Sequence, residues 1–502
     1  MVRRALIIAA GAQYLRIAVR LASIAFVARL LTPSEIGVAV IGTAIMTIAL
    51  GLREFASPEF LIQRHEIGRD DIRASFTVLF VMTGLMTVMM FLLAPWIGAF
   101  YGEEGLARFI QITAAAGLIE AASLPILGVL RRDMAFGAVA CIQTTSATVT
   151  AVVTAWLALA GFSYMSYAWA TVAAAGATIV LSFYFRPDLS ILRPVFKSWG
   201  RVLTFGGYNG ASFVINRIYE ALPQLVLGHL LPHSAVGLYN RASVVSDIPD
   251  KIVLTSVFSV AFPALAVEVR EGRNLKKSYL QALGFITVFY WPAQVLLALL
   301  AYPVVLLFLG SQWLDGVVPL LQVMAVAGLA WFPVMLTSPV LLAVGANRDR
   351  VLADLIGRSV SAVILCSAAW FGIMAMAASK LVTLPFQMVL SLWFVRRHVA
   401  FRWREVGAAL WKSAVVTAGS TAGPAGVMAL SDQGFALSMA ATGLAVLLAA
   451  CGWLAGVIIT RHPVLPELRK AVDEIAETPF VRRGWRWRER AIASGPRAGE
   501  AR

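Results

Sequence analysis

The chain has 502 residues, of which 59% are hydrophobic and 14% charged, and its mean hydropathy is +0.79. These values lie far outside the range of water-soluble domains, so a soluble enzyme is excluded. The formal net charge of +15 would suggest nucleic-acid binding in a soluble protein. In a chain this apolar, its meaning depends on where the basic residues lie.

Long apolar runs predict about fourteen membrane-spanning helices, because each crossing needs roughly 20 apolar residues. The first run, at 5–29, has no small-residue cleavage site after it and is interrupted by Arg16 and Arg20, so we interpret it as a retained helix. The others lie at 36–61, 74–98, 107–130, 136–160, 164–185, 202–228, 236–262, 279–303, 317–344, 351–377, 379–395, 411–430 and 435–459. The sequence therefore predicts an all-α polytopic membrane protein.

Most of the 42 Lys and Arg residues fall on one side of these helices, and the opposite side holds only Arg29, Arg108 and Lys380. Basic residues near helix ends resist translocation, so the basic side is expected to face the cytoplasm together with both termini. The three cysteines lie inside apolar runs without metal-ligand spacing. We therefore expect no disulfide, no metal site and no cofactor.

Two halves of the chain resemble each other. Residues 30–37 read Leu-Leu-Thr-Pro-Ser-Glu-Ile-Gly, and residues 230–237 read Leu-Leu-Pro-His-Ser-Ala-Val-Gly. Residues 111–118 resemble 322–329 in the same order, and an Arg-Asp step follows each, at 132–133 and 348–349. Six predicted helices separate each pair, so the halves are expected to be two lobes related by a pseudo-twofold axis along the membrane normal, with a cavity between them.

The lobes divide the chain into five predicted parts. These are an N-terminal six-helix lobe at 1–185, an amphipathic cytoplasmic linker at 186–201, a C-terminal six-helix lobe at 202–395, an additional transmembrane helix pair at 396–460 and a basic cytoplasmic tail at 461–502. The tail interleaves Trp with Arg at 482–490, and tethering at the membrane favours anionic lipid headgroups over nucleic acid. A solvated tail is the alternative.

Four segments carry a resemblance to a known family. They are Ala-Arg-Leu-Leu-Thr-Pro-Ser-Glu-Ile-Gly at 28–37, Phe-Leu-Ile-Gln at 60–63, Gly-Leu-Tyr-Asn-Arg-Ala at 237–242 and Val-Ala-Phe-Pro-Ala-Leu at 260–265. The chain resembles the polysaccharide transporter family of the multidrug, oligosaccharidyl-lipid and polysaccharide exporter superfamily over most of residues 1–400. It departs at 51–60, where charges and a proline replace a small apolar stretch.

The resemblance implies a flippase rather than an enzyme. Two six-helix lobes around a central cavity would move undecaprenyl-pyrophosphate-linked oligosaccharide repeat units across the bacterial inner membrane by alternating access, for exopolysaccharide or lipopolysaccharide assembly. The implied ligand is a lipid-linked oligosaccharide, and a polysaccharide polymerase or export machinery is a candidate partner. In relatives, basic residues on the first, second and eighth helices line the cavity.

Arg16 and Arg20 are the sharpest candidates for an anion site. They are four residues apart and share a helical face, and the run at 5–29 contains no Asp or Glu. Two stacked like charges repel unless they line water or hold an anion, and a guanidinium group can donate two parallel hydrogen bonds to a phosphate. The alternative is a set of structural ion pairs with Glu54, Glu120 or Glu220.

Other polar residues inside the predicted helices are secondary candidates, because such residues need a partner, water or a ligand. Glu120 is the best isolated candidate for a protonatable acid, and Arg217 can pair with Glu220 within one helix. The candidates for the lipid-pyrophosphate are Arg16, Arg20, Arg53, Arg217 and Arg241. Those for a polar or coupling role are Glu120, Asn209, Asn216, Glu220, Asp247 and Asp250.

Two other functions remain open. A multidrug or cation antiporter of the same fold should concentrate acids in its cavity. A membrane-embedded glycan polymerase or ligase needs catalytic groups in a long outer loop, whereas the predicted outer connections are short. The chain has no phosphate-binding loop of the Gly-X-X-X-X-Gly-Lys-Ser/Thr type, so ATP is not expected to drive transport directly.

Overall fold

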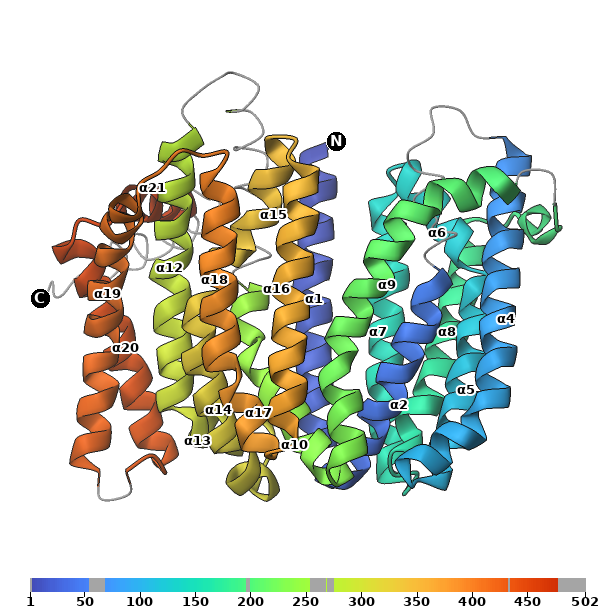
Figure 1. Ribbon diagram of the computed structural model, residues 1–502, viewed down its shortest axis with the longest axis horizontal. Coiled ribbons are helices and arrows are strands. Elements are labelled where there is room, and N and C mark those ends of the chain that lie inside the picture. The colour runs from blue at the N-terminus through green and yellow to red at the C-terminus, as the bar shows by residue number, and fades with distance from the viewer. Residues whose placement is uncertain are drawn as a thin grey trace, which may run out of the picture. The chain divides into compact units, whose positions relative to one another are not determined.

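The computed structural model describes residues 2–53, 68–195, 199–252, 268, 275–431 and 434–476. Its regular elements within these ranges are helices, with no β-strand, and Figure 1 shows them as long rods. The predicted all-α class is confirmed. The chain forms two compact units, each of which collects segments that are distant in sequence.

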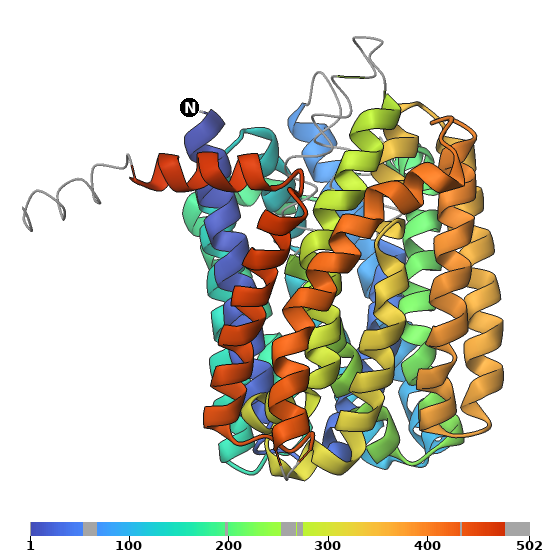
Figure 2. The same cartoon turned by 90° about the vertical axis from the view of Figure 1, so that its left-hand side faces the viewer.

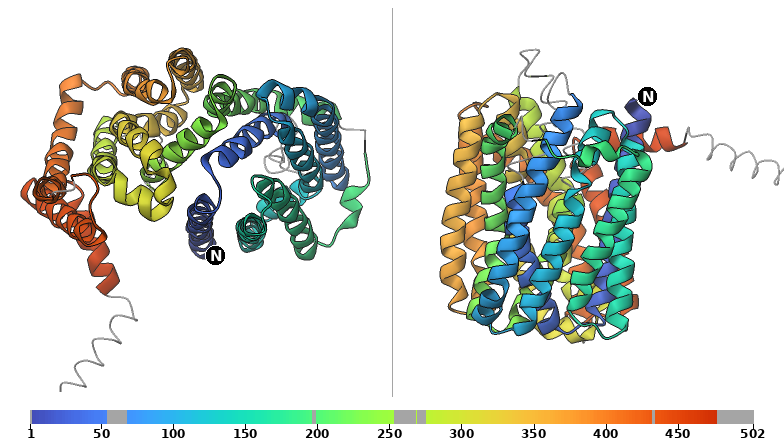
Figure 3. Two further views of the ribbon diagram at one scale, coloured as in Figure 1. Left: turned by 90° about the horizontal axis from the view of Figure 1, so that it is seen from below. Right: turned by 90° about the vertical axis from the view of Figure 1, so that its right-hand side faces the viewer.

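The first unit comprises Met1–Asp247, Ala301–Ala327 and Asp354–Phe386. Within it α4, α5, α7 and α8 pack as neighbours, and α1 packs against α7 (Figures 1 and 3). Its main helices are α1 (Val2–Ala28), α2 (Pro33–Gly51), α4 (Arg69–Tyr101), α5 (Glu104–Ala121), α6 (Leu124–Arg132), α7 (Phe136–Leu159), α8 (Met165–Phe185), α9 (Trp199–Leu230), α10 (His233–Ser246), α13 (Ala301–Phe308), α14 (Leu314–Gly328) and α17 (Ile373–Ala378).

The second unit comprises Ile248–Leu300, Gly328–Ala353 and Gln387–Arg502. In it α12 and α20 both pack against α19, and Figure 2 shows α21 turned across the end of the α19–α20 pair. Its main helices are α12 (Leu275–Leu299), α15 (Val334–Ala343), α19 (Trp403–Leu430), α20 (Met439–Ile459) and α21 (Leu465–Ala476), and α16 (Asn347–Ala369) and α18 (Lys380–Arg396) contribute to both units.

Ten helical segments among the described residues are long and apolar enough to cross a membrane, or eleven if the bent pair α5 and α6 is one crossing. The chain is therefore a multi-pass membrane protein. Our prediction of about fourteen crossings also includes α9 and α19, which are 32 and 28 residues long but carry charged residues. The count of fourteen and the division into two six-helix lobes remain predictions.

The repeated segment that begins α2 and α10 forms a close helix crossing. A capping box of Thr32 and Glu35 starts α2, with Pro33 in its first turn. Gly37 lies so near α10 that a Cβ atom there would be 1.8 Å from the carbonyl oxygen of His233. A Cβ atom on Gly237 would in turn be 2.0 Å from the carbonyl oxygen of Pro33. The shared glycine of the repeat therefore permits backbone contact between the two copies.

The second repeated feature, the Arg-Asp step, forms a similar ion pair in each unit. Asp133, just after α6, accepts a 2.6 Å hydrogen bond from Arg186 after the end of α8. In the second unit Asp349 lies 2.8 Å from the His398 ring and 3.9 Å from Arg397, both just after α18. Asp133 thus ties the end of α6 to the end of α8, and Asp349 ties the first turn of α16 to the end of α18.

A buried polar network joins α12, α19 and the turn before α21. The His462 ring is 1% exposed and lies 3.2 Å from the Ser413 hydroxyl, which also accepts a 2.9 Å hydrogen bond from Thr287. The other ring nitrogen accepts the backbone N–H of Val464. Desolvation, with a smaller contribution from the positive charge of Lys412, lowers the pKa of His462 to about 4.

Substituting Gly37 by alanine should destabilise the protein by about 1–3 kcal/mol, because the methyl group overlaps the α10 backbone. The matched control is Gly176→Ala in α8, where the new methyl group meets open space and should be neutral or slightly stabilising. Thermal unfolding in detergent compares the two. Equal melting temperatures for both variants would contradict the close crossing.

Acidification should destabilise the second unit through His462. The unfolded chain takes up a proton near pH 6.5, whereas the folded ring resists protonation until about pH 4. Stability is therefore retained above pH 6.5 and lost as the pH falls from 6.5 to 4. Thermal unfolding of wild type and His462→Gln across this range checks the effect, and an unchanged pH slope in the variant would count against it.

Candidate functional site

A cavity of about 770 Å³ lies within the first unit, among α1, α2, α7, α8, α9 and α10. Most of the side chains on its walls are uncharged. Two pairs of threonines spaced four residues apart contribute hydroxyl groups, Thr43 and Thr47 from α2 and Thr150 and Thr154 from α7. Gln13, Gln224 and Asn240 add amide groups. A cavity of this size that presents hydroxyl, amide and guanidinium groups among apolar helices can hold a ligand with hydrophilic groups within a membrane protein.

The charged residues on the cavity walls are mostly basic. Arg16, Arg20 and Arg241 line it, and the single acidic lining residue is Glu220 among the side chains that the structure describes. The structure therefore brings together three of the five arginines that we expected to bind the lipid-pyrophosphate. The net formal charge of these four groups is positive, which favours an anionic ligand.

Arg16 and Arg20 project from one face of α1, as their spacing predicted. Arg16 is half-buried and donates a hydrogen bond to the Gln13 side chain one turn earlier. Arg20 is exposed and has no hydrogen bond or ion pair with any part of the chain that the structure describes. Neither arginine pairs with Glu120 or Glu220, so the structural ion pairs considered as an alternative are absent for these two carboxylates. Glu54 lies outside the described residues.

Arg241 is the most deeply buried charged residue of the cavity, with 4% of the residue exposed. One of its terminal nitrogens donates a 3.0 Å hydrogen bond to the Tyr167 hydroxyl of α8. Its Nε atom is buried and finds no acceptor within the described ranges. Among the described residues, the hydrogen-bond partner of this positive charge is thus a phenol hydroxyl and not a carboxylate.

Glu220 is paired within its own helix. Its carboxylate accepts a 2.7 Å hydrogen bond from Arg217, three residues earlier on α9. The predicted pairing of these two residues is confirmed. Because Arg217 neutralises Glu220, the carboxylate does little to offset the charges of the α1 arginines.

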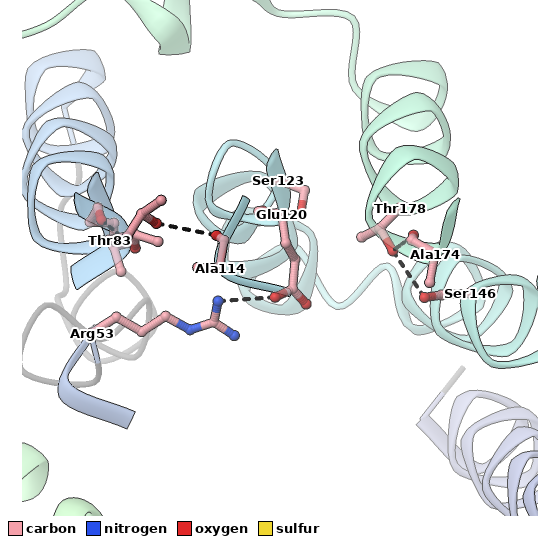
Figure 4. Close-up of polar contacts among 10 residues, drawn as sticks. Arg53, Thr83, Ala114, Glu120, Ser123, Ser146, Ala174 and Thr178 are labelled. Carbon is pink, nitrogen blue, oxygen red and sulfur yellow. Dashed lines mark hydrogen bonds and ion pairs between the residues drawn. The ribbon is translucent and has the colours of Figure 1, made fainter. Parts of the chain in front are cut away.

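Arg53 and Glu120 form an ion pair that the cavity does not include. The Arg53 guanidinium, just after α2, donates a 2.9 Å hydrogen bond to the Glu120 carboxylate of α5, as Figure 4 shows. Their side chains are 17% and 38% exposed. The expectation that Glu120 is isolated is therefore wrong. Arg53 lies just after α2, and its guanidinium group reaches the carboxylate on α5 and neutralises it.

The remaining candidates do not belong to the cavity wall. Asn216 lies on α9 but is not a lining residue, and Asp247 is an exposed residue that ends α10. Asp250 is half-buried and has an interaction partner. The side chain of Asn209 lies outside the described residues. Their roles as coupling residues remain predictions.

Sequence reasoning missed Tyr167 and the threonine pairs. The four-residue spacing of Thr43 and Thr47, and of Thr150 and Thr154, was the available signal, because it places two hydroxyls on one helical face. Each of these hydroxyls donates to the carbonyl four residues earlier, over 2.7–2.9 Å. Their oxygens therefore remain available as acceptors of hydrogen bonds from a ligand.

Apolar helices around a cavity lined by three arginines define a multi-pass membrane protein with a predominantly basic cavity. Comparison with known families places it more narrowly. The chain belongs to the polysaccharide biosynthesis protein family, whose sequence profile matches residues 26–318.

Characterised relatives align with about three fifths of the chain. The lipopolysaccharide biosynthesis protein WzxC of Escherichia coli (strain K12) is 24% identical over 310 residues, which are 60% of this chain and 62% of that protein. The succinoglycan biosynthesis transport protein ExoT of Rhizobium meliloti (strain 1021) is 26% identical over 297 residues, 58% and 59% of the two chains. The chain thus matches about three fifths of the length of these relatives.

Solved structures share the fold at low sequence identity. The lipid II flippase MurJ in an inward closed conformation has a TM-score of 0.72 and 13% identity, covering 91% of this chain and 99% of that chain. An inward-facing multidrug resistance MATE family transporter of the MOP superfamily has a TM-score of 0.63 and 12% identity, covering 77% and 94%. These matches establish the fold expected from the superfamily resemblance.

Replacing Arg53 by glutamine should lower stability by roughly 1–3 kcal/mol, because Glu120 is left charged and half-buried without its partner. The double variant Arg53→Gln with Glu120→Gln should recover most of that loss. Thermal unfolding in detergent measures both, with Arg108→Gln on the exposed face of α5 as control. A double variant less stable than Arg53→Gln alone would refute a mainly structural pair.

Proposed function

We propose that this protein is a flippase for lipid-linked oligosaccharides that carry a pyrophosphate, and not an enzyme. The observation that carries the proposal is the basic cavity, which Arg16, Arg20 and Arg241 line. The one carboxylate among its described lining residues, Glu220, already pairs with Arg217. The family membership and the names of the relatives support a role in polysaccharide biosynthesis. The cargo would be an undecaprenyl-pyrophosphate-linked repeat unit for exopolysaccharide or lipopolysaccharide.

Arg16 and Arg20 are the proposed ligands of the pyrophosphate. Their guanidinium groups supply two positive charges on one helix face, and each can donate paired hydrogen bonds to phosphate oxygens. Without a ligand, neighbouring like charges repel, so a bound pyrophosphate relieves that repulsion as well as forming contacts. Arg241 adds positive charge to the same space.

The uncharged part of the cavity suits the sugar units. Threonine oxygens accept hydrogen bonds from sugar hydroxyls, and Asn240 offers both donors and acceptors. Gln224 offers its amide oxygen, because its amide nitrogen donates to backbone carbonyls of α9. A binding site lined by hydroxyl and amide groups tolerates several sugars, because each contact is weak and adjustable. The lipid tail needs no place in the cavity, since the surrounding bilayer solvates it.

Transport by alternating access fits the repeated architecture. In this proposal the predicted lobes at 1–185 and 202–395 move against each other and carry the headgroup from the cytoplasmic to the outer leaflet of a bacterial inner membrane. Both termini would lie in the cytoplasm, where the basic tail at 461–502 would meet anionic headgroups. A polymerase or export complex would take up the product.

The two alternatives have less support from the cavity. A cation exporter needs negative charge in its ligand space, whereas three arginines and one neutralised glutamate line this one. A glycan polymerase or ligase would need a set of catalytic groups. Three of the four charged residues on this cavity are arginines, which cannot act as bases near neutral pH, and the fourth, Glu220, is paired with Arg217.

Removing the α1 arginines should abolish transport of lipid-linked oligosaccharide without unfolding the protein. Arg16→Gln and Arg20→Gln should each reduce transport by tenfold or more, since each removes a charge-assisted hydrogen bond to phosphate. Arg→Lys at either position should retain partial activity, because lysine keeps the charge but loses the planar fork. Export in cells that lack the native protein measures the effect at matched protein levels.

The control is Arg469→Gln on the exposed surface of α21, which should export normally. Normal export by well-expressed Arg16→Gln and Arg20→Gln proteins would contradict the pyrophosphate assignment. If the variants lose protein abundance instead of transport activity, and removing an acidic residue restores that abundance, the arginines have a structural role.

A further inference from the structure

The ends of three helices provide a common reference for depth in the cavity. Close backbone contacts at Gly37 and Gly237 place the start of α2 level with the start of α10. Because α1 ends at Ala28, only a short turn before Pro33, its end lies at the same level. Depths can therefore be compared along α1, α2 and α10 from this shared end.

The two arginines of α1 lie deep and lean away from the reference end. At 1.5 Å per residue, the Cα atoms of Arg20 and Arg16 lie about 12 and 18 Å from Ala28. Helical side chains lean toward the N-terminus of their own helix. The hydrogen bond from Arg16 to Gln13, one turn earlier, follows this direction. Their guanidinium groups therefore lie deeper than their Cα atoms.

Arg241 leans the opposite way. Its Cα atom lies about 12 Å from the start of α10, but α10 runs inward from the reference end, so its side chain leans back toward that end. Tyr167, its partner, is in the first turn of α8 and packs against the cluster that contains Ala39 of α2. The Arg241 side chain thus leans toward a different level of the cavity from the side chains of Arg16 and Arg20.

The chemistry of the two levels also differs. The level of Arg16 and Arg20 on α1 supplies two positive charges, which match the two negative charges of a pyrophosphate diester. The Arg241 level supplies one charge and one phenol hydroxyl. A single planar carboxylate matches one guanidinium group, because both can form two parallel hydrogen bonds.

Arg241 also lacks a sufficient partner among the residues that the structure describes. It is 4% exposed, it lines the cavity, and its Nε–H finds no acceptor among the described residues. A buried guanidinium without a counter-ion is unfavourable unless a ligand supplies the negative charge. The neutral Tyr167 hydroxyl orients the side chain but does not neutralise it.

We propose that Arg241 and Tyr167 form a second anion subsite, which binds a carboxylate on the sugar portion of the cargo while Arg16 and Arg20 hold the pyrophosphate. The cargo class is then an acidic oligosaccharide. This inference rests on the proposed flippase function and assigns Arg241 a role in selecting the glycan. Tyr167 is a positioning residue that holds the Arg241 guanidinium at the level of the cavity nearer the starts of α2 and α10.

The test compares two cargoes that differ in one group. Purified full-length protein in proteoliposomes is given undecaprenyl-pyrophosphate trisaccharides that end either in a hexuronic acid or in the corresponding neutral hexose. Binding and transport are measured for wild type, Arg241→Gln and Tyr167→Phe. The control is Tyr219→Phe, whose hydroxyl meets Ser359 instead of the cavity.

Arg241→Gln should weaken binding of the acidic cargo roughly tenfold to hundredfold and weaken binding of the neutral cargo much less, because the neutral cargo lacks the carboxylate that Arg241 binds. Tyr167→Phe should produce a smaller loss for the acidic cargo alone, which a general folding defect would not do. Equal losses for both cargoes would overturn the subsite and place Arg241 with the pyrophosphate. Unchanged binding of both would overturn it as well.

Failure of the proposed function has a different signature. If wild type moves neither cargo, the flippase assignment fails, while the binding difference between the two cargoes still decides the subsite. If wild type binds and moves both cargoes equally and the variants do the same, the flippase assignment stands and the acidic subsite fails.

Discussion

Three guanidinium groups share one cavity with a carboxylate that is already neutralised, and the functional account depends on this imbalance. A positive charge among apolar helices is costly unless water, an acid or a ligand compensates it. Arg53 shows the structural solution, because Glu120 pairs with it. Arg16, Arg20 and Arg241 line the cavity instead, and in the proposed function an anionic ligand compensates their charges. The same residue type thus serves two purposes, and only the position of the nearest carboxylate distinguishes them.

The scaffold that holds these charges is built from repeated elements. Gly37 and Gly237 let two copies of one segment meet at backbone distance, which aligns the starts of α2 and α10. Asp133 and Asp349 each pair with a basic residue that follows a later helix, so a similar ion pair joins two helices in each unit. Because α1 and α10 run in opposite directions beside the cavity, their arginines lean to different depths. In the proposed arrangement of two anion subsites, the direction of each helix therefore sets the depth of its arginines.

Much of this could be predicted from the sequence, and the failures have a physical cause. Apolar runs predicted the helical class, and four-residue spacing placed Arg16 and Arg20 on one face, because both signals are local. The pairing of Arg53 with Glu120 and the contact between Arg241 and Tyr167 join helices distant in sequence. No periodicity reports how two helices rotate against each other, so Glu120 was expected to be isolated and Tyr167 was overlooked. Resemblance to a family indicated which helices carry the basic residues, but it did not indicate which of their arginines are neutralised by a carboxylate.

The most direct test of the account is an experimental structure of the full-length protein with a lipid-linked oligosaccharide bound. The account predicts pyrophosphate density within hydrogen-bonding distance of both Arg16 and Arg20, with the glycan extending along the threonines of α2 and α7. Pyrophosphate bound elsewhere, with water alone around the α1 arginines, would contradict the claim that these charges exist to hold the headgroup.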